Sequence, residues 1–254
     1  MIIRTTSQKI VFSLLVLLLV LTVAKDWFDF YSCGGAVGQC FSDAGRMQFY
    51  TKFGMSLLLT VLAFIVANRA FCSRDAGFLR LAFVFSLLAD FSFSLIKAFF
   101  PATGSLNTVL GIGFFMLFQA VMIFRNSRHD ESDRSLPKAY WVIAAVAAVF
   151  VVLGFAGVVG ALVAEVLVYG SFVIASTVVA FLAPNKAYFP KENAPFVRWG
   201  MVAFFFGDVL VGLSMLSGDD HSALQLVSCV ANNFIWLLYV PAQLMLIRSA
   251  AKAE

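Results

Sequence analysis

Eight long apolar segments alternate with short polar segments along the chain. They cover residues 9–25, 49–68, 78–99, 107–124, 139–158, 161–183, 196–216 and 224–247. Each is long enough to cross a hydrocarbon layer about 30 Å thick as a helix, which takes about 17–25 residues. The runs are continuous and do not alternate in polarity as the strands of an outer-membrane barrel do. The pattern predicts an all-α membrane protein with eight transmembrane helices.

Composition and charge support this class and predict an orientation. The chain is 61% hydrophobic and 13% charged, whereas a soluble domain carries about 25% charged residues. Most of the 18 Lys and Arg residues fall on one side of the predicted spans; the other side holds Lys25, Arg46, Lys52 and Lys97. The positive-inside rule then places both termini in the cytoplasm. We expect a multi-pass protein of the inner (plasma) membrane, surrounded by lipid and without a nucleic-acid partner.

Two stretches of the chain resemble each other. Residues 60–70 (TVLAFIVANRA) match residues 177–187 (TVVAFLAPNKA). The next span of each half contains an arginine and, further along, an aspartate: Arg80 and Asp90 in the first half, Arg198 and Asp208 in the second. The separation between the two copies is nearly constant over two spans. We therefore predict one membrane domain, 1–254, built from two parallel four-helix repeats at about 9–125 and 139–248, related by an axis along the membrane normal.

The matched aspartates are the strongest candidates for a functional site. Asp90 lies in the apolar stretch FVFSLLADFSFSL and Asp208 in MVAFFFGDVLVGL. Each follows its arginine, Arg80 or Arg198, by about 15 Å of helix, which is half of the hydrocarbon thickness. An ionised carboxylate at that depth costs roughly 2.5–3.5 kcal/mol. Two such acids indicate a site, and the repeat axis would bring them toward one another; helix packing alone is the alternative.

Polar side chains recur at helical spacing around these acids. The candidates for binding a substrate or orienting water are Ser86, Gln119, Glu165, Tyr169, Asn232, Tyr239 and Gln243. Hydrogen bonds between helices are the alternative explanation for an isolated Ser, Asn or Gln. For Glu165 the alternative is a structural ion pair with Lys97.

Cysteines and histidines do not predict a metal site. Cys33 and Cys40 share one external loop, where a disulfide and two free thiols are both open possibilities. His129 and His221 fall in loops on opposite faces, which argues against a His-ligated zinc hydrolase. We expect no metal and no cofactor.

Three short motifs in order resemble the YhhN-type membrane proteins, the lysoplasmalogenase family. They are F-S-L-L-A-D at residues 85–90, F-F-F-G-D-V-L at 204–210 and Y-V-P-A-Q at 239–243. The chain departs from the family at Ala89, where glycine or another small polar residue is expected, and at Gln119, where histidine is more frequent. The resemblance implies hydrolysis of the vinyl ether bond of lysoplasmalogens to a fatty aldehyde and a glycerophospho-head group.

The candidate residues suit that reaction. A vinyl ether is cleaved by protonation of its β carbon, which generates an oxocarbenium ion that water captures. Two neighbouring carboxyl groups in a low-dielectric site share a proton, so Asp90 and Asp208 together are predicted to be the general acid and base. The alternative function is a proton-coupled transporter of a small or lipid-like substrate that uses the same aspartates as a relay. A receptor or purely structural membrane protein is the third possibility.

Overall fold

We analysed a computed structural model of the chain, which describes residues 5–32, 37–100, 105–215 and 223–252. For residues 37–47 and Lys97 only the backbone is described. The question of a Cys33–Cys40 disulfide and the predicted Lys97–Glu165 ion pair therefore lie outside the described residues.

Every predicted apolar segment contains a helix. The helices are α1 (Thr6–Ser32), α2 (Val37–Ala67), α3 (Ser73–Phe91), α4 (Lys97–Phe99), α5 (Leu106–Asn126), α6 (Ala139–Phe155), α7 (Ala161–Leu182), α8 (Ala194–Ser214) and α9 (Ala223–Arg248). In the described ranges, 7 helices are long and apolar enough to cross a membrane, and α6, with 17 residues, is shorter. The all-α membrane class is confirmed. The count of eight crossings and the orientation of the termini stay predictions.

Two helix ends differ from the prediction for local reasons. Helix α1 continues past Lys25 to Ser32, because Lys25 pairs with Asp29 one turn later at 2.6 Å (Nζ to Oδ2) and so supports a helix beyond the apolar run. Helix α6 ends at Phe155 and is followed by Gly157 at φ 70°. Glycine adopts this left-handed conformation without steric cost, so the turn ends the helix early.

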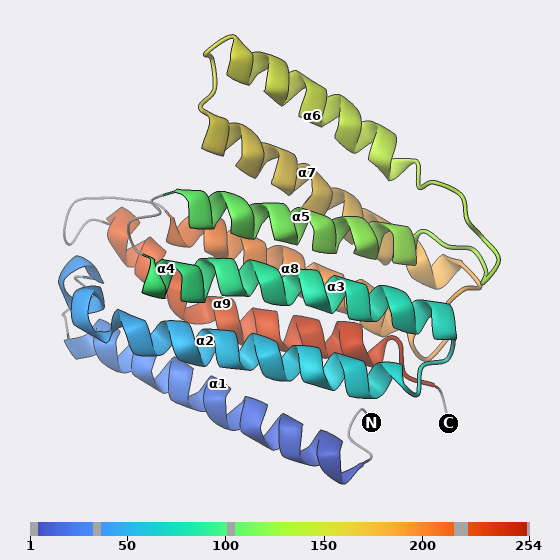
Figure 1. Cartoon of the computed structure of the whole chain (residues 1–254), viewed down its shortest axis with the longest axis horizontal. Coiled ribbons are helices and arrows are strands. Elements are labelled where there is room, and N and C mark those ends of the chain that lie inside the picture. The colour runs from blue at the N-terminus through green and yellow to red at the C-terminus, as the bar shows by residue number, and fades with distance from the viewer. Residues whose placement is uncertain (1–4, 33–36, 101–104, 216–222, 253–254) are drawn as a thin grey trace.

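Six helices form a closed ring of neighbours. Going around it, α2 packs on α3, α3 on α5, α5 on α7, α7 on α8, α8 on α9, and α9 returns to α2. Helix α1 lies outside the ring against α2 and α9, and α6 lies at the opposite edge against α7 (Figure 1). Helices α2, α5, α7 and α9 all finish at one end of the bundle, where Arg125 and Arg248 lie in the last turns of α5 and α9. We call this the basic end. The two-repeat organisation stays a prediction, and in it α3 and α8 would be equivalent helices.

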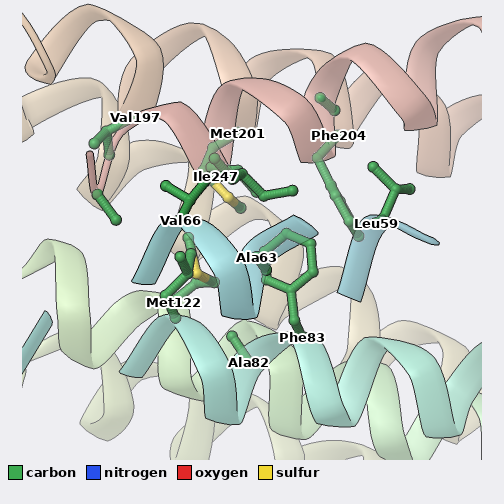
Figure 2. Packing of buried hydrophobic residues seen from close by; sticks show 14 of the residues in the cluster. Leu59, Ala63, Val66, Ala82, Phe83, Met122, Val197, Met201, Phe204 and Ile247 are labelled. Carbon is green, nitrogen blue, oxygen red and sulfur yellow. The ribbon is translucent and has the colours of Figure 1, made fainter. Parts of the chain in front are cut away.

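The core joins both halves of the chain. Figure 2 shows side chains of α2, α3, α5, α8 and α9 meeting between the helices, with Phe83, Phe204 and Met201 among them. Lipid tails are as apolar as these residues, so close packing rather than transfer from water stabilises the contact. At Gly200, an added Cβ would lie 2.9 Å from the Leu246 side chain. This glycine therefore permits the close approach of α8 to α9.

A buried ion pair holds the basic end together. Arg125 at the end of α5 donates two hydrogen bonds to Asp75 at the start of α3, each 2.8 Å long, and both side chains are fully buried. The Tyr188 hydroxyl, from the loop between α7 and α8, donates to the same carboxylate at 3.2 Å. Burial raises the pKa of Tyr188, so the hydroxyl keeps its proton for this bond. The cluster fixes the second half of the chain to the first.

Candidate functional site

Asp90 is the end point of a buried hydrogen-bond chain. Its Oδ2 accepts a 2.5 Å bond from the Ser56 hydroxyl of α2 and a 2.8 Å bond from the Tyr239 hydroxyl of α9. The Ser86 and Tyr239 hydroxyls lie 2.8 Å apart, and the Gln243 amide donates to Ser86 at 3.1 Å. Three helices, α2, α3 and α9, thus contribute to the environment of one carboxylate.

All hydrogen bonds that lead to Asp90 run in one direction. A tyrosine hydroxyl carries one proton, and Tyr239 uses it on Asp90, so Ser86 must donate to Tyr239. Gln243 in turn donates to Ser86. Every donor therefore points toward Asp90, and an ionised carboxylate, which only accepts hydrogen bonds, is the form that suits this arrangement.

Asp208 has a smaller polar environment formed by α7 and α5. Its Oδ2 accepts one bond, 2.9 Å long, from the Tyr169 hydroxyl. The Gln119 side chain lies near this hydroxyl, and its Oε1 accepts a 2.6 Å bond from Ser176. Within the described part of the chain, the Gln243 Oε1 is buried without a hydrogen-bond partner, whereas the Gln119 Nε2 lies close to the Tyr169 hydroxyl. The Gln243 Oε1 is therefore a buried acceptor that the Asp90 network leaves unused.

Aromatic rings connect the two networks. The Phe115 ring lies 6.4 Å from the rings of both Tyr169 and Tyr239, centroid to centroid, and 6.1 Å from that of Phe204. The two tyrosine side chains are close enough to interact electrostatically. No contact between the Asp90 and Asp208 carboxyl groups is found among the described residues. Among the described residues the two acids belong to separate hydrogen-bond networks, and Phe115 contacts the tyrosine of each.

The helix that carries Asp90 changes its winding just after the acid. Residues Ser92–Ile96 form a π-helical turn between α3 and α4, a feature that often occurs at functional sites. Phe93 in this turn packs directly over Gly111 of α5, where an added Cβ would lie 2.5 Å from the ring. In a regular α-helix, Ser94 and Lys97 would lie on the same face as Asp90, four and seven residues after it. The π-helical turn changes this spacing.

Most of the predicted site residues come together. Ser86, Gln119, Tyr169, Tyr239 and Gln243 all belong to the two networks. Two other predicted substrate-binding residues lie elsewhere. Asn232 contacts its neighbour Asn233, which donates to the backbone of α1. Glu165 lies outside both hydrogen-bond networks and lines an apolar cleft between α5, α6 and α7.

Sequence reasoning missed two contributors. Ser56 and Thr60 are the two hydroxyl residues in the apolar run 53–67 of α2, and Thr60 donates to the Ser56 carbonyl one turn earlier. That spacing is the one signal in the sequence that could have indicated Ser56. Phe115 is one of 29 phenylalanines, so composition cannot distinguish it.

The arrangement provides two buried acids in different hydrogen-bonding environments. Asp90 accepts two hydroxyl bonds on one oxygen, and Asp208 accepts one. The aromatic rings of Phe115 and Phe204 pack around the tyrosines and make the surroundings of both acids apolar. Proton transfer between the protein and an apolar substrate is the chemistry that this combination suits.

Comparison with known proteins gives one relationship. The model of the YhhN family matches residues 47–250, which is most of the chain and includes both acids and both tyrosines. No curated protein and no solved structure matches the chain.

Proposed function

The chain belongs to the YhhN family, and we propose that it is a membrane hydrolase that cleaves the vinyl ether bond of lysoplasmalogens. The products are a fatty aldehyde and a glycerophospho-head group. The observation that carries the proposal is the pair of buried acids, Asp90 and Asp208, each bound to its own tyrosine hydroxyl. This pairing supplies a proton donor and a carboxylate without a cofactor.

The different environments of the acids suggest their roles. Asp208, with one hydrogen bond, donates its proton to the β carbon of the vinyl ether. Asp90, at which the donor chain ends, is the carboxylate that stabilises the oxocarbenium ion and accepts a proton from the attacking water. The water oxygen then forms the new C–O bond, and the result is a hemiacetal.

The second half of the reaction restores both acids. Asp208, now ionised, takes the proton of the hemiacetal hydroxyl while the C–O bond to glycerol breaks. Asp90, now protonated, gives its proton to the departing glycerol oxygen. The aldehyde and the head-group alcohol leave, and each carboxyl group is back in its starting form.

The tyrosines hold the acids in place during this exchange. Tyr239 and Tyr169 donate to Asp90 and Asp208 at 2.8 and 2.9 Å, so each carboxyl group has one oxygen fixed. The unpaired Gln243 Oε1, and the Gln119 amide beside the Tyr169 hydroxyl, are suited to orient the water or the glycerol oxygens.

The test is aldehyde release by the purified protein in liposomes that contain a lysoplasmalogen. The carboxyl proton of the enzyme exchanges with the solvent before it is transferred. In D2O the mechanism therefore predicts one deuterium on the carbon next to the aldehyde carbonyl. Aldehyde without that deuterium contradicts protonation at the β carbon, and no aldehyde from a folded protein contradicts the proposed function. A proton-coupled transporter, the alternative, predicts substrate flux in the same liposomes without hydrolysis.

A further inference from the structure

A cleft opens between α5, α6 and α7 on the lipid-facing side of the bundle. Its volume is about 480 Å³, and its walls are formed by Met116 of α5, by a face of α6 and by the first half of α7. All lining residues but one are apolar, and several are small, among them Ala147, Gly154 and Ala164. Glu165 is the exception. We call this the α6 cleft.

The position of α6 explains why the cleft exists. Helix α1 covers the junction between α2 and α9, but α6 packs along α7 and makes at most slight contact with α5. Near the basic end the Tyr140 hydroxyl of α6 donates to the Ala120 carbonyl of α5 at 2.5 Å. Helix α6 is therefore attached to α5 at its beginning, and the cleft lies further along it, from Ala147 to Phe155. Figure 1 shows α6 at the edge of the bundle.

The cleft is lined by residues that neighbour the candidate site along α5 and α7. Two of its lining residues, Val168 and Met116, are chain neighbours of Tyr169 and Phe115. Glu165 precedes Tyr169 by one helical turn and so lies on the same face of α7. At the other end, Phe155 and Val151 are exposed, so the cleft opens to the surroundings of the bundle. In a bilayer those surroundings are hydrocarbon.

We propose that the α6 cleft binds the hydrocarbon chain of the lipid substrate and selects its length. The proposal rests on the proposed function and names the subsite for the part of the substrate that does not react. From Ala147 to Phe155 the α6 wall is about 12 Å long at 1.5 Å per residue. A single unbranched chain that starts beside Tyr169 extends along this wall toward Phe155.

The cleft acts by shape and not by hydrophobic transfer. Lipid tails outside are as apolar as the cleft, so a chain gains little by leaving the bilayer. A wall of small residues instead admits a chain of a given length and loses fit when the wall changes. When two substrates differ in chain size, a hydrophobic pocket changes the ratio of their kcat/KM values by about tenfold or more.

Matched substitutions on α6 test the proposal. Ala147→Phe fills the cleft, whereas Ala148→Phe places the same ring on the exposed face of the same helix. On α7, Ala164→Phe and Val163→Phe form a second such pair. Each is measured as kcat/KM for lysoplasmalogens with short, medium and long alkenyl chains.

We expect the cleft variants to lower kcat/KM for long relative to short chains by at least about tenfold, and the exposed-face variants to leave the ratio within about twofold. Retained activity on short chains shows that the cleft variants fold. Equal ratios in the members of each pair overturn the proposal.

A second measurement keeps the inference separate from the proposed reaction. A lysophospholipid with a photoreactive group in its alkyl chain is crosslinked to the protein in liposomes, and the labelled residues are mapped by mass spectrometry. Labels concentrated on the cleft and reduced by Ala147→Phe, but not by Ala148→Phe, support chain binding even if no aldehyde is formed. Labels spread evenly over the lipid-facing helices indicate bulk lipid only and overturn it.

Discussion

Removing the Tyr239 hydroxyl tests the hydrogen-bond chain to Asp90 directly. In Tyr239→Phe the ring and its aromatic contacts remain, but Asp90 loses the 2.8 Å bond and keeps the one from Ser56. A hydrogen bond to a charged group contributes about 1.5–3 kcal/mol. If that bond holds the carboxylate against the oxocarbenium ion, its loss lowers kcat by about 10- to 150-fold.

The loss is expected in kcat more than in KM, because the charge that Asp90 stabilises exists only during the reaction. The assay is the steady-state rate of aldehyde release in liposomes. Tyr188→Phe is the matched control, since it removes a buried hydroxyl that bonds Asp75 at the basic end. We expect its kcat to stay within about twofold of the unmodified protein. A Tyr239→Phe variant that turns over at the unmodified rate refutes the role given to Tyr239.

Further predictions concern the packing that holds the site. Asp75→Asn leaves the fully buried Arg125 without its carboxylate partner, so we expect a loss of about 3–5 kcal/mol in the free energy of unfolding in detergent; unchanged stability contradicts the buried ion pair. Gly111→Ala places a Cβ 2.5 Å from the Phe93 ring, so we expect about 1–3 kcal/mol of destabilisation from overpacking. Gly113→Ala is its control, because nothing lies within 4 Å of that Cβ, and equal effects in the two variants contradict the packing of the π-helical turn.

Apolar length was sufficient to locate the helices. Each predicted segment contains one, because a run of about 20 apolar residues has few alternatives to a helix in lipid. The helix ends were harder to predict, since they depend on local contacts such as the Lys25–Asp29 pair. The π-helical turn at Ser92–Ile96 contains no glycine or proline that would have indicated it. Its Phe93 packs over Gly111 of another helix, a contact that the sequence of the turn does not reveal.

Helical spacing located most of the polar network but not its connections. Ser86, Tyr239 and Gln243 were candidates because they share faces with other polar residues, and they form one donor chain. Spacing within a helix cannot tell which helices are neighbours. This is why Ser56 of α2 was missed, and why Asn232, with equally regular spacing, lies outside the network.

The most direct test of the central claim compares the unmodified protein with Asp90→Asn and Asp208→Asn. The measurement is single-turnover aldehyde release from a lysoplasmalogen, with the fold of each variant checked by its unfolding midpoint in detergent. Both substitutions keep the shape of the side chain and remove the carboxyl group. The two-acid mechanism predicts release by the unmodified protein and a loss of at least about a hundredfold in each folded variant. Release that persists in either variant contradicts it.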